Sequence, residues 1–366
     1  MTCLINLLSW LPGHSGFGSY VKRVVPQVSG LRLQLDADGS PTLLSESAWT
    51  TSPPGWSPSR RLRFLQRYGL VQHGVDLSLL LGGFGLSDSN IGVIYSPFFD
   101  ALFEFPSPPQ LITCHDLTPL IVPNSRKAWF RYRFWQPRHC RAATRLIAIS
   151  QHVADQLVAF GVKPADIEVI PNGIAISRPK VTSPQSQDLL VLARHDKNKN
   201  LEALLKGVAV LQQKKSAWNG VLRIIGRPGS ETKALQRLCQ SLPDPNQVQW
   251  ISHVSQETLI ALLRTSMALI SASIEEGFDY PVLESKAEGI PTIISDIPVH
   301  REFHDGSSLF FSPHDDGTTL ARCTEMLMGD SSLWLQLSDM GYKVASCYSL
   351  ERQATHIQSQ IDFLVR

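Results

Sequence analysis

The amino-acid sequence predicts an α/β protein with two Rossmann-like domains, each built on a parallel sheet. Short apolar runs that suit buried strands alternate with segments of helical length along most of the chain. A polar stretch at residues 177–187 interrupts this alternation. The 366 residues are enough for two domains with sizeable cores. Strands separated by helices form parallel sheets covered on both faces, so the pattern predicts two such sheets and one cleft.

The expected strands follow from the apolar runs. In the first half they lie at residues 4–8, 31–35, 91–96, 110–114, 146–149 and 167–170. In the second half they lie at residues 189–192, 221–225, 248–251, 267–270, 292–294 and 308–311. The segments between them are expected to be helices or loops, with a polar loop at 40–58, a basic helix at 59–68 and Ser150 as a helix N-cap.

These elements set the expected domain boundaries. We place an N-terminal domain at residues 1–175 and a C-terminal domain at residues 176–347. A final helix at residues 350–364 follows a break in the pattern. We expect the segment 348–366 to cross back to the N-terminal domain.

Composition narrows the class of protein. The chain is 43% hydrophobic and 18% charged, which is typical of a soluble α/β protein. A formal net charge of +2 gives no general field for nucleic acid. The six cysteines form no Cys-x-x-Cys pair, which indicates neither zinc nor a disulfide framework and favours a reducing, cytoplasmic compartment. Neither a signal peptide nor a membrane span is expected.

The most informative stretch is residues 271–295. A buried strand leads into a loop with Glu276, Pro281 suits the first position of a helix, and Gly289 suits its end. Glu276 and Glu284 flank a helix start whose free N–H groups favour an anion. A nucleotide sugar carries phosphate for the helix and hydroxyls for the carboxylates. The alternative is that Glu276 caps the helix and Glu284 is solvated.

The segment Glu276-Gly-Phe-Asp-Tyr-Pro-Val-Leu-Glu284 resembles the Glu-x7-Glu motif of glycosyltransferase family 4. The resemblance continues over residues 289–302 and departs at Asp279-Tyr280, where many members have Gly-Leu. It implies the GT-B fold, two Rossmann-like domains facing a central cleft, with residues 1–175 on the acceptor side and residues 176–347 binding the nucleotide sugar. It also implies a retaining hexosyltransferase, with mannose or glucose as the expected sugar, that needs neither cofactor nor metal. The expected partners are a nucleotide-sugar donor and a hydroxyl acceptor such as a growing glycan or a lipid-linked sugar.

Other segments fit the same resemblance. Arg194 and Lys199 follow a predicted strand and could neutralise a diphosphate, although spacing alone allows a solvated turn. His115 ends another strand, where a lone histidine is often structural. The resemblance assigns catalysis to Glu276, His115, Arg194 and Lys199. It assigns donor binding to Gly16, Gly18, Arg194, Lys199, His253, Gly277, Phe278, Asp279, Val282, Leu283 and Glu284.

Three further interpretations remain to be weighed. Asp36-Ala-Asp38 is interpreted as a turn and not as a metal site, because no further ligands surround it.

A nucleotide-sugar epimerase or a non-catalytic nucleotide-sugar binder could share the fold. Residues 126–145 hold seven Lys and Arg and five aromatic residues, which suits peripheral contact with an anionic membrane on its inner face. An amphipathic helix docked on the sheet is the alternative.

Overall fold

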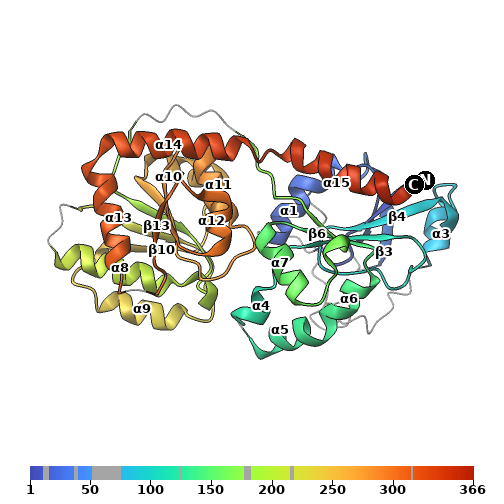
Figure 1. Ribbon diagram of the computed structural model, residues 1–366, viewed down its shortest axis with the longest axis horizontal. Helices are drawn as coiled ribbons and strands as arrows, with labels where there is room; N and C mark the ends of the chain where they lie inside the picture. Colours follow the sequence, from blue (N-terminus) through green and yellow to red (C-terminus); the bar gives the residue numbers. More distant parts are fainter. Residues whose placement is uncertain are drawn as a thin grey trace. The chain divides into compact units, whose positions relative to one another are not determined.

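The computed structural model describes residues 1–10, 16–36, 40–51, 76–123, 125–176, 183–214, 218–314 and 316–366. The chain divides into two compact units (Figure 1). Unit 1 comprises Met1–Leu120, Arg126–Gly173 and Leu350–Arg366, and unit 2 comprises Ile121–Ser125 and Ile174–Ser349. Each unit is built on its own sheet, and the α/β prediction is confirmed.

Among the described residues, the sheet of unit 1 has the strand order β3-β2-β1-β4-β5-β6-β7. The strands are β1 (Thr2–Asn6), β2 (Leu31–Leu35), β3 (Pro41–Leu44), β4 (Ile91–Ser96), β5 (Gln110–Cys114), β6 (Arg145–Ala148) and β7 (Ile167–Val169). Neighbouring strands are parallel except β3, which pairs antiparallel with β2. Strands β4 and β5 are buried along their whole length, which explains their continuous apolar runs.

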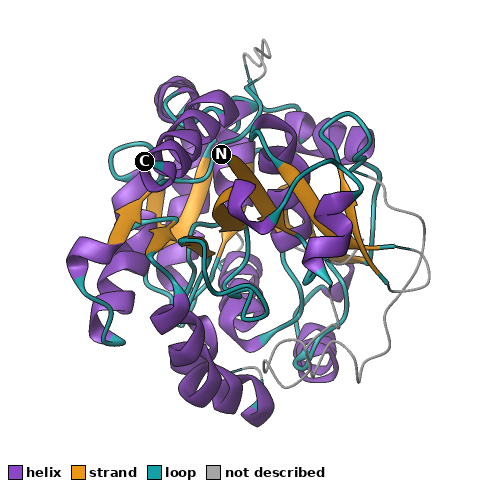
Figure 2. Ribbon diagram, turned by 90° about the vertical axis from the view of Figure 1, so that its right-hand side faces the viewer, coloured by secondary structure: helices purple, strands orange, loops and turns teal. Residues whose placement is uncertain are grey.

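Helices lie on both faces of this sheet (Figure 2). They are α1 (Gly16–Val24), α3 (Leu77–Gly82), α4 (Thr118–Ile121), α5 (Arg126–Phe130), α6 (Gln136–Ala142), α7 (Gln151–Ala159) and α15 (Leu350–Val365). A π-helix, η3 (Arg131–Trp135), joins α5 to α6, and short 3-10 turns occupy Val25–Gln27, Asp88–Asn90 and Pro164–Asp166. Ser150 caps α7 as predicted, because its side chain accepts a hydrogen bond from the Val153 N–H at 3.1 Å.

The C-terminal helix α15 packs on the sheet of unit 1. Ile357 and Ile361 are buried in the same apolar cluster as Ile5 of β1 and Val93 of β4. Its Gln353 side chain accepts a hydrogen bond from the Gly173 N–H at 2.8 Å. The last helix therefore belongs to the core formed by the first strands.

The described part of unit 2 contains a parallel sheet with the strand order β10-β9-β8-β11-β12-β13. The strands are β8 (Leu189–Leu192), β9 (Leu222–Ile225), β10 (Val248–Ile251), β11 (Ala268–Ser271), β12 (Thr292–Ser295) and β13 (Leu309–Phe311). The order runs outward from β8 to β10 on one side and from β11 to β13 on the other. The direction of winding therefore reverses between β8 and β11, as in Rossmann domains.

Helices connect these strands and cover the sheet of unit 2. They are α8 (Leu201–Gln213), α9 (Thr232–Gln240), α10 (Gln256–Thr265), α11 (Tyr280–Ala287), α12 (Pro298–His304), α13 (Thr318–Gly329) and α14 (Ser331–Ser346), with 3-10 turns at Lys197–Lys199 and Pro245–Gln247. Helix α11 carries Pro281 in its first turn and ends before Gly289, whose φ of 72° is left-handed. Both predictions for this helix are confirmed.

Some predictions need correction or fall outside the described residues. Residues 41–44, expected in a loop, form the edge strand β3, where Pro41 is tolerated at the first position. Asp36 accepts a hydrogen bond from the Ser40 N–H at 2.9 Å, as in the expected turn, whereas Asp38 lies outside the described residues. The predicted helix at 59–68 also lies outside them.

Within the described ranges, no helix combines the length and apolarity needed to cross a membrane.

Lys286 is a buried cation in α11. Its side chain is 1% exposed, and its Nζ donates a hydrogen bond to Ser307 Oγ at 2.5 Å. Helix α14 makes room for it with Gly341, where an added Cβ would lie 3.0 Å from Lys286 Cγ. Burial lowers the pKa of Lys286 from 10.5 to about 7. Between about pH 7 and 10.5 the unfolded chain binds the extra proton, so this group favours the folded state more as pH rises.

We expect Lys286→Met to raise the thermal unfolding midpoint at pH 7 and to flatten its rise between pH 7 and 9. Methionine keeps most of the side-chain volume and removes the buried charge. Thermal unfolding measured between pH 7 and 9 checks this prediction, with the exposed Lys233→Met as a matched control. If the unfolding midpoint of Lys286→Met rose with pH as steeply as that of the wild type, the buried-cation interpretation would be contradicted.

Candidate active site

The predicted residues of unit 2 gather where the winding of the sheet reverses. Arg194 and Lys199 follow β8, and the segment from Glu276 to Asp279 follows β11, the neighbouring strand. A backbone hydrogen bond from the Ile274 N–H to the Asn198 carbonyl, 2.9 Å long, joins the two loops. Open α/β sheets bind ligands at this switch point.

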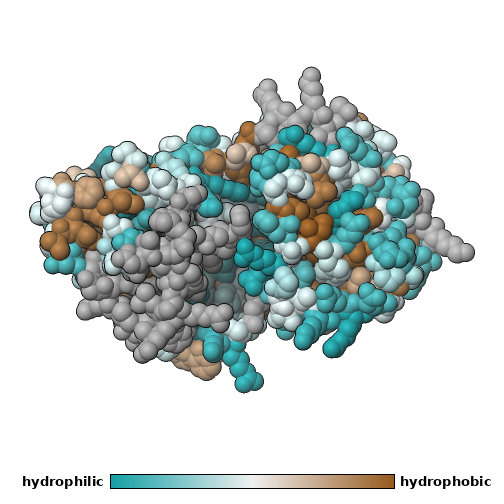
Figure 3. Space-filling view, turned by 180° about the vertical axis from the view of Figure 1, so that it is seen from behind, coloured by the Kyte–Doolittle hydropathy of each residue, from teal (hydrophilic) through white to brown (hydrophobic). Residues whose placement is uncertain are grey.

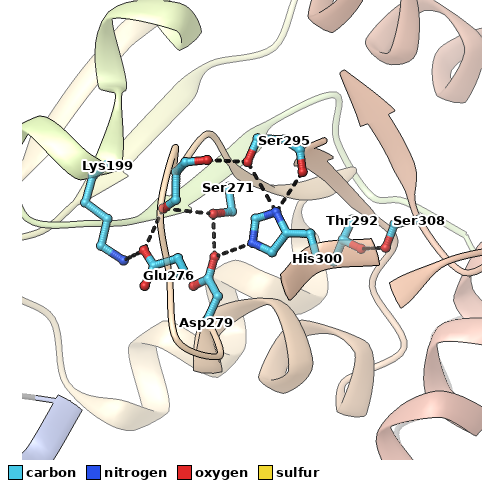
Figure 4. A network of polar contacts seen from close by, with 9 residues as sticks. Lys199, Ser271, Glu276, Asp279, Thr292, Ser295, His300 and Ser308 are labelled. Atoms are coloured by element: carbon cyan, nitrogen blue, oxygen red, sulfur yellow. Dashed lines mark hydrogen bonds and ion pairs between the residues drawn. The ribbon is translucent and has the colours of Figure 1, made fainter. Parts of the chain in front are cut away.

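An ion pair joins the two loops at their side chains. Lys199 Nζ donates a hydrogen bond to Glu276 Oε1, and Ser273 Oγ donates to the same oxygen at 2.7 Å (Figure 4). The side chains of Lys199 and Glu276 are only 22% and 14% exposed. The alternative in which Glu276 caps α11 is not supported, because the carboxylate faces Lys199 and Ser273.

Asp279 lies on the same loop and points inward. Its Oδ2 accepts a hydrogen bond from Ser271 Oγ at 2.5 Å and lies 3.1 Å from His300 Nε2 (Figure 4). A small hollow between the ends of β8 and β11 is lined by Leu192, Lys199, Ser273, Asp279 and Pro281, among others. Lys199 therefore places a cation in the wall of the hollow, whereas the side chain of Asp279 is only 2% exposed.

The two carboxylates have different proton affinities. Burial raises the pKa of Glu276 above its ordinary value, and Lys199 and Ser273 only partly oppose this shift. Burial acts in the same direction on Asp279, but the charge of Lys199 and the hydrogen bonds from His300 and Ser271 outweigh it. The pKa of Asp279 therefore lies below its ordinary value, and Asp279 is ionised at neutral pH.

The first turn of α11 presents backbone to the site. The side chains of Val282 and Leu283 are fully buried, and Phe278 packs edge-on against Phe303 with ring centroids 4.8 Å apart. These predicted donor-binding residues can therefore reach a ligand only through their backbone, as can Gly277. Glu284 is half-buried one turn into the helix.

Arg194 is held at the end of β8 by a neighbouring carboxylate. Its guanidinium is 66% exposed and lies 3.4 Å from Asp196 Oδ2. Gly226, at the end of β9, lets the two strand ends approach, since an added Cβ would lie 1.8 Å from the Ala193 carbonyl oxygen. His253 follows β10 and is exposed, two strands away from β8.

The predicted residues of unit 1 form a separate group. His115 follows β5 and is buried, with Nε2 2.8 Å from the Pro97 carbonyl and the ring edge-on to Tyr20 at 4.5 Å. Burial lowers the pKa of His115 to about 4, so the ring is neutral at pH 7. Asp116 Oδ1 accepts a hydrogen bond from the Thr118 N–H at 3.1 Å and caps the next turn.

The glycine loop of unit 1 is shorter than expected. Helix α1 already begins at Gly16, so Gly16 and Gly18 lie in its first turn, and residues 11–15 are outside the described residues. A helix start has backbone N–H groups without intrahelical partners, which suits both glycines to close backbone approach by a ligand.

The sequence interpretation missed the polar residues beneath the loop. Ser271, Ser273, Ser295 and His300 hold Glu276 and Asp279 in place. Two serines at alternate positions, Ser271 and Ser273, follow an apolar strand. This pattern could have predicted that both side chains face the loop. Among the described residues, no three His, Cys, Asp or Glu side chains gather as a metal site.

Family models match both halves of the chain. Residues 51–178 match the model described as Glycosyltransferase Family 4, and residues 174–343 match the model described as Glycosyl transferases group 1. The chain belongs to the group 1 glycosyltransferases. The resemblance inferred from the Glu-x7-Glu segment is therefore confirmed.

Curated relatives of this group 1 glycosyltransferase include mannosyltransferases. The O-antigen chain mannosyltransferase RfbU of Salmonella typhimurium is 27% identical over 210 residues, which cover 57% of this chain and 58% of RfbU. The serotype-specific mannosyltransferase WbdA of Escherichia coli is 27% identical over 54% of this chain and 27% of WbdA. The matches thus span less than two thirds of these relatives.

Solved structures share the fold of this group 1 glycosyltransferase. The Anabaena protein HepE, in complex with UDP and glucose, has a TM-score of 0.72 at 14% identity and covers 99% of this chain and 100% of its own. Sucrose-phosphate synthase of Thermosynechococcus elongatus has a TM-score of 0.70 at 14% identity, covering 100% and 99%. At this identity the likeness concerns the fold, and the GT-B architecture is confirmed.

Proposed function

We propose that the chain transfers a hexose from a nucleoside diphosphate sugar to a hydroxyl acceptor, with retention at the anomeric carbon. The observation that carries the proposal is the Lys199–Glu276 pair at the switch point of the second sheet. It offers a cation for a phosphate and a carboxylate for sugar hydroxyls within one small site. The names of RfbU and WbdA support mannose, and HepE, solved with glucose, supports glucose as the second choice.

The proposed chemistry separates binding from charge stabilisation. The bond between the anomeric carbon and the diphosphate oxygen breaks, a bond to the acceptor oxygen forms, and the proton of the acceptor hydroxyl passes to the departing diphosphate. Lys199, Arg194 and the start of α11 stabilise the charge on the departing diphosphate without a metal. Glu276 accepts hydrogen bonds from the sugar, and Glu284 accepts them from the ribose. Neutral His115 contacts the transferred sugar.

A donor panel tests this function. Purified protein is incubated with GDP-mannose, UDP-glucose and other nucleotide sugars, with and without glycan or lipid-linked acceptors. We expect free nucleoside diphosphate to form only when an acceptor is present. Its formation should continue in excess EDTA, because cationic side chains of the protein stabilise the departing diphosphate. An isomerised donor would favour an epimerase, and binding without product a non-catalytic binder. Loss of activity in EDTA, restored by manganese or magnesium, would refute the metal-independent mechanism.

We expect Arg194→Ala or Lys199→Ala to lower turnover roughly 10²-fold or more, because each removes a preorganised charge next to the leaving group. Steady-state kinetics check this, with the exposed Lys197→Ala in the same turn as the control. Arg194→Ala should leave thermal stability unchanged. Lys199→Ala should lower it, because Glu276 and Asp279 lose their shared counter-charge. Wild-type turnover in both variants would exclude these residues from the site.

We also propose that unit 1 meets an anionic membrane surface on the cytoplasmic side. Within the basic and aromatic segment 126–145, α5, η3 and α6 extend to Ala142 and β6 begins at Arg145. The buried face of these helices is formed by Tyr132, Gln136 and His139. Phe130 and Phe134 are instead 52% and 51% exposed and stack with ring centroids 5.6 Å apart. The docked-helix alternative is therefore wrong for these two aromatic residues.

Basic side chains surround this exposed aromatic pair. Arg126, Lys127 and Arg133 are exposed on the same segment. Figure 3 shows hydrophobic and hydrophilic residues side by side at the lower edge of unit 1, where Figure 1 places α5. Aromatic rings among cationic side chains suit the headgroup layer of an anionic bilayer. Such a surface would hold the enzyme near a lipid-linked acceptor.

Sedimentation with vesicles tests the membrane contact. We expect the protein to bind vesicles rich in anionic lipid at low salt and to dissociate as salt rises, because surface charges are screened within about 10 Å at 0.1 M. Replacing Arg126, Lys127 and Arg133 by Ser should weaken binding severalfold. Replacing the exposed Lys233, Arg237 and Arg322 of unit 2 removes the same charge and is the control. Equal binding by both triple variants would contradict the assignment of this surface.

A further inference from the structure

His300 of α12 lies directly beneath the loop that carries Glu276. The side chain is fully buried, and its Nε2 lies 3.1 Å from Asp279 Oδ2. Its Nδ1 lies 2.8 Å from the carbonyl oxygen of Ser295, at the end of β12 (Figure 4). The ring therefore connects the end of β12 to the loop after β11.

The hydrogen-bond partners of His300 fix the orientation of its ring. A carbonyl oxygen can only accept a hydrogen bond, so Nδ1 donates to the Ser295 carbonyl. The Ser295 hydroxyl donates its proton to the Ser273 carbonyl at 2.5 Å. The other ring nitrogen, Nε2, therefore faces the Asp279 carboxylate.

The backbone at Asp279 explains why the loop needs this support. Asp279 has a φ of 68°, and the only other described non-glycine residue with positive φ is Asn200. The left-handed conformation is unfavourable for a non-glycine residue and persists where surrounding contacts over-determine it. Asp279 is the N-cap residue of α11, but its side chain makes no capping hydrogen bond, because Oδ2 bonds with Ser271 and His300 instead.

The opposite end of the same loop is also held from β12. The Ser273 carbonyl accepts the hydrogen bond from Ser295, and the Ser273 hydroxyl donates to Glu276 at 2.7 Å. Ser295 holds the loop at Ser273, and His300 holds it at Asp279. Because His300 also contacts Ser295, its ring connects these two points of attachment of the 273–279 loop. The position of the Glu276 carboxylate depends on both supports.

We propose that His300 is a positioning residue for the donor sugar, and that it holds the 273–279 loop by fixing Asp279. The inference rests on the proposed function. The loop meets the sugar through Glu276, whereas Arg194 and Lys199 meet the diphosphate from the loop after β8. Loss of His300 should therefore weaken binding of a nucleotide sugar more than binding of the free nucleoside diphosphate.

Calorimetric titration measures this difference. GDP-mannose and GDP, and UDP-glucose and UDP, are titrated into the wild type, His300→Leu and His300→Gln. For the pair that the wild type binds, we expect His300→Leu to raise the Kd of the nucleotide sugar roughly tenfold more than that of the nucleoside diphosphate. His300→Gln keeps one N–H donor for Asp279 and should recover part of the loss.

The control is His304→Leu on the same helix. His304 is 1% exposed, and neither ring nitrogen has a hydrogen-bond partner among the described residues. Leucine should leave both Kd values unchanged and should not lower thermal stability, because no hydrogen bond is lost. If replacing any buried histidine of α12 weakened ligand binding, the Kd values of His304→Leu would rise as well.

A double variant keeps the test valid if His300→Leu does not fold. Glycine adopts a φ of 68° without strain, so Asp279→Gly/His300→Leu leaves neither a buried unpaired carboxylate nor a strained turn. We expect Asp279→Gly and the double variant to show the same ratio of the two Kd values, because His300 acts through Asp279.

Two results would overturn the inference alone, given wild-type binding. One is an unchanged ratio in His300→Leu, whether or not both ligands bind more weakly, and the other is a further change of ratio when His300→Leu is added to Asp279→Gly. Failure of the wild type to bind any nucleotide sugar of the donor panel would overturn the proposed function, and the inference with it.

Discussion

The Lys199–Glu276 ion pair is the interaction on which the rest of the site depends. It joins the loops that leave β8 and β11, the two adjacent strands at which the sheet changes direction. Removing both charges from water is costly, so such a pair contributes little to stability by itself. Its structural effect is to tie the two loops together beside the hollow that Lys199 lines.

Charge balance extends this constraint to the layer beneath. Glu276 and Asp279 bring two carboxylates into one poorly solvated site, and Lys199 alone cannot neutralise both. His300 lies behind Asp279, with Nε2 3.1 Å from Asp279 Oδ2 and Nδ1 2.8 Å from the Ser295 carbonyl. A diphosphate entering the hollow would compete with Glu276 for Lys199. The contacts behind Asp279 would remain, which explains how the loop could keep its shape while the ion pair in front of it rearranges.

The sequence predicted the strands of this fold better than the contacts of its site. Buried parallel strands such as β5 and β8 read as continuous apolar runs, so their bounds were predicted correctly. Strand β3 was missed because an edge strand that begins with proline gains its structure from pairing with β2. The Asp279–His300 contact depends on how β12 and α12 pack behind β11, and residue spacing along the chain carries no signal for that packing. The two glutamates were found through a local motif.

Asp279 shows why the supporting layer is better explained by ligand binding than by stability. Many members of the resembling family have glycine at this position, and glycine would adopt the left-handed backbone freely. The aspartate instead adds backbone strain and a buried charge, and it requires Ser271 and His300 to offset both. A residue that destabilises the free loop in two ways persists where a fixed loop is needed. The fixed element here is the turn that carries Glu276. Asp279 of this turn lines the same hollow as Lys199.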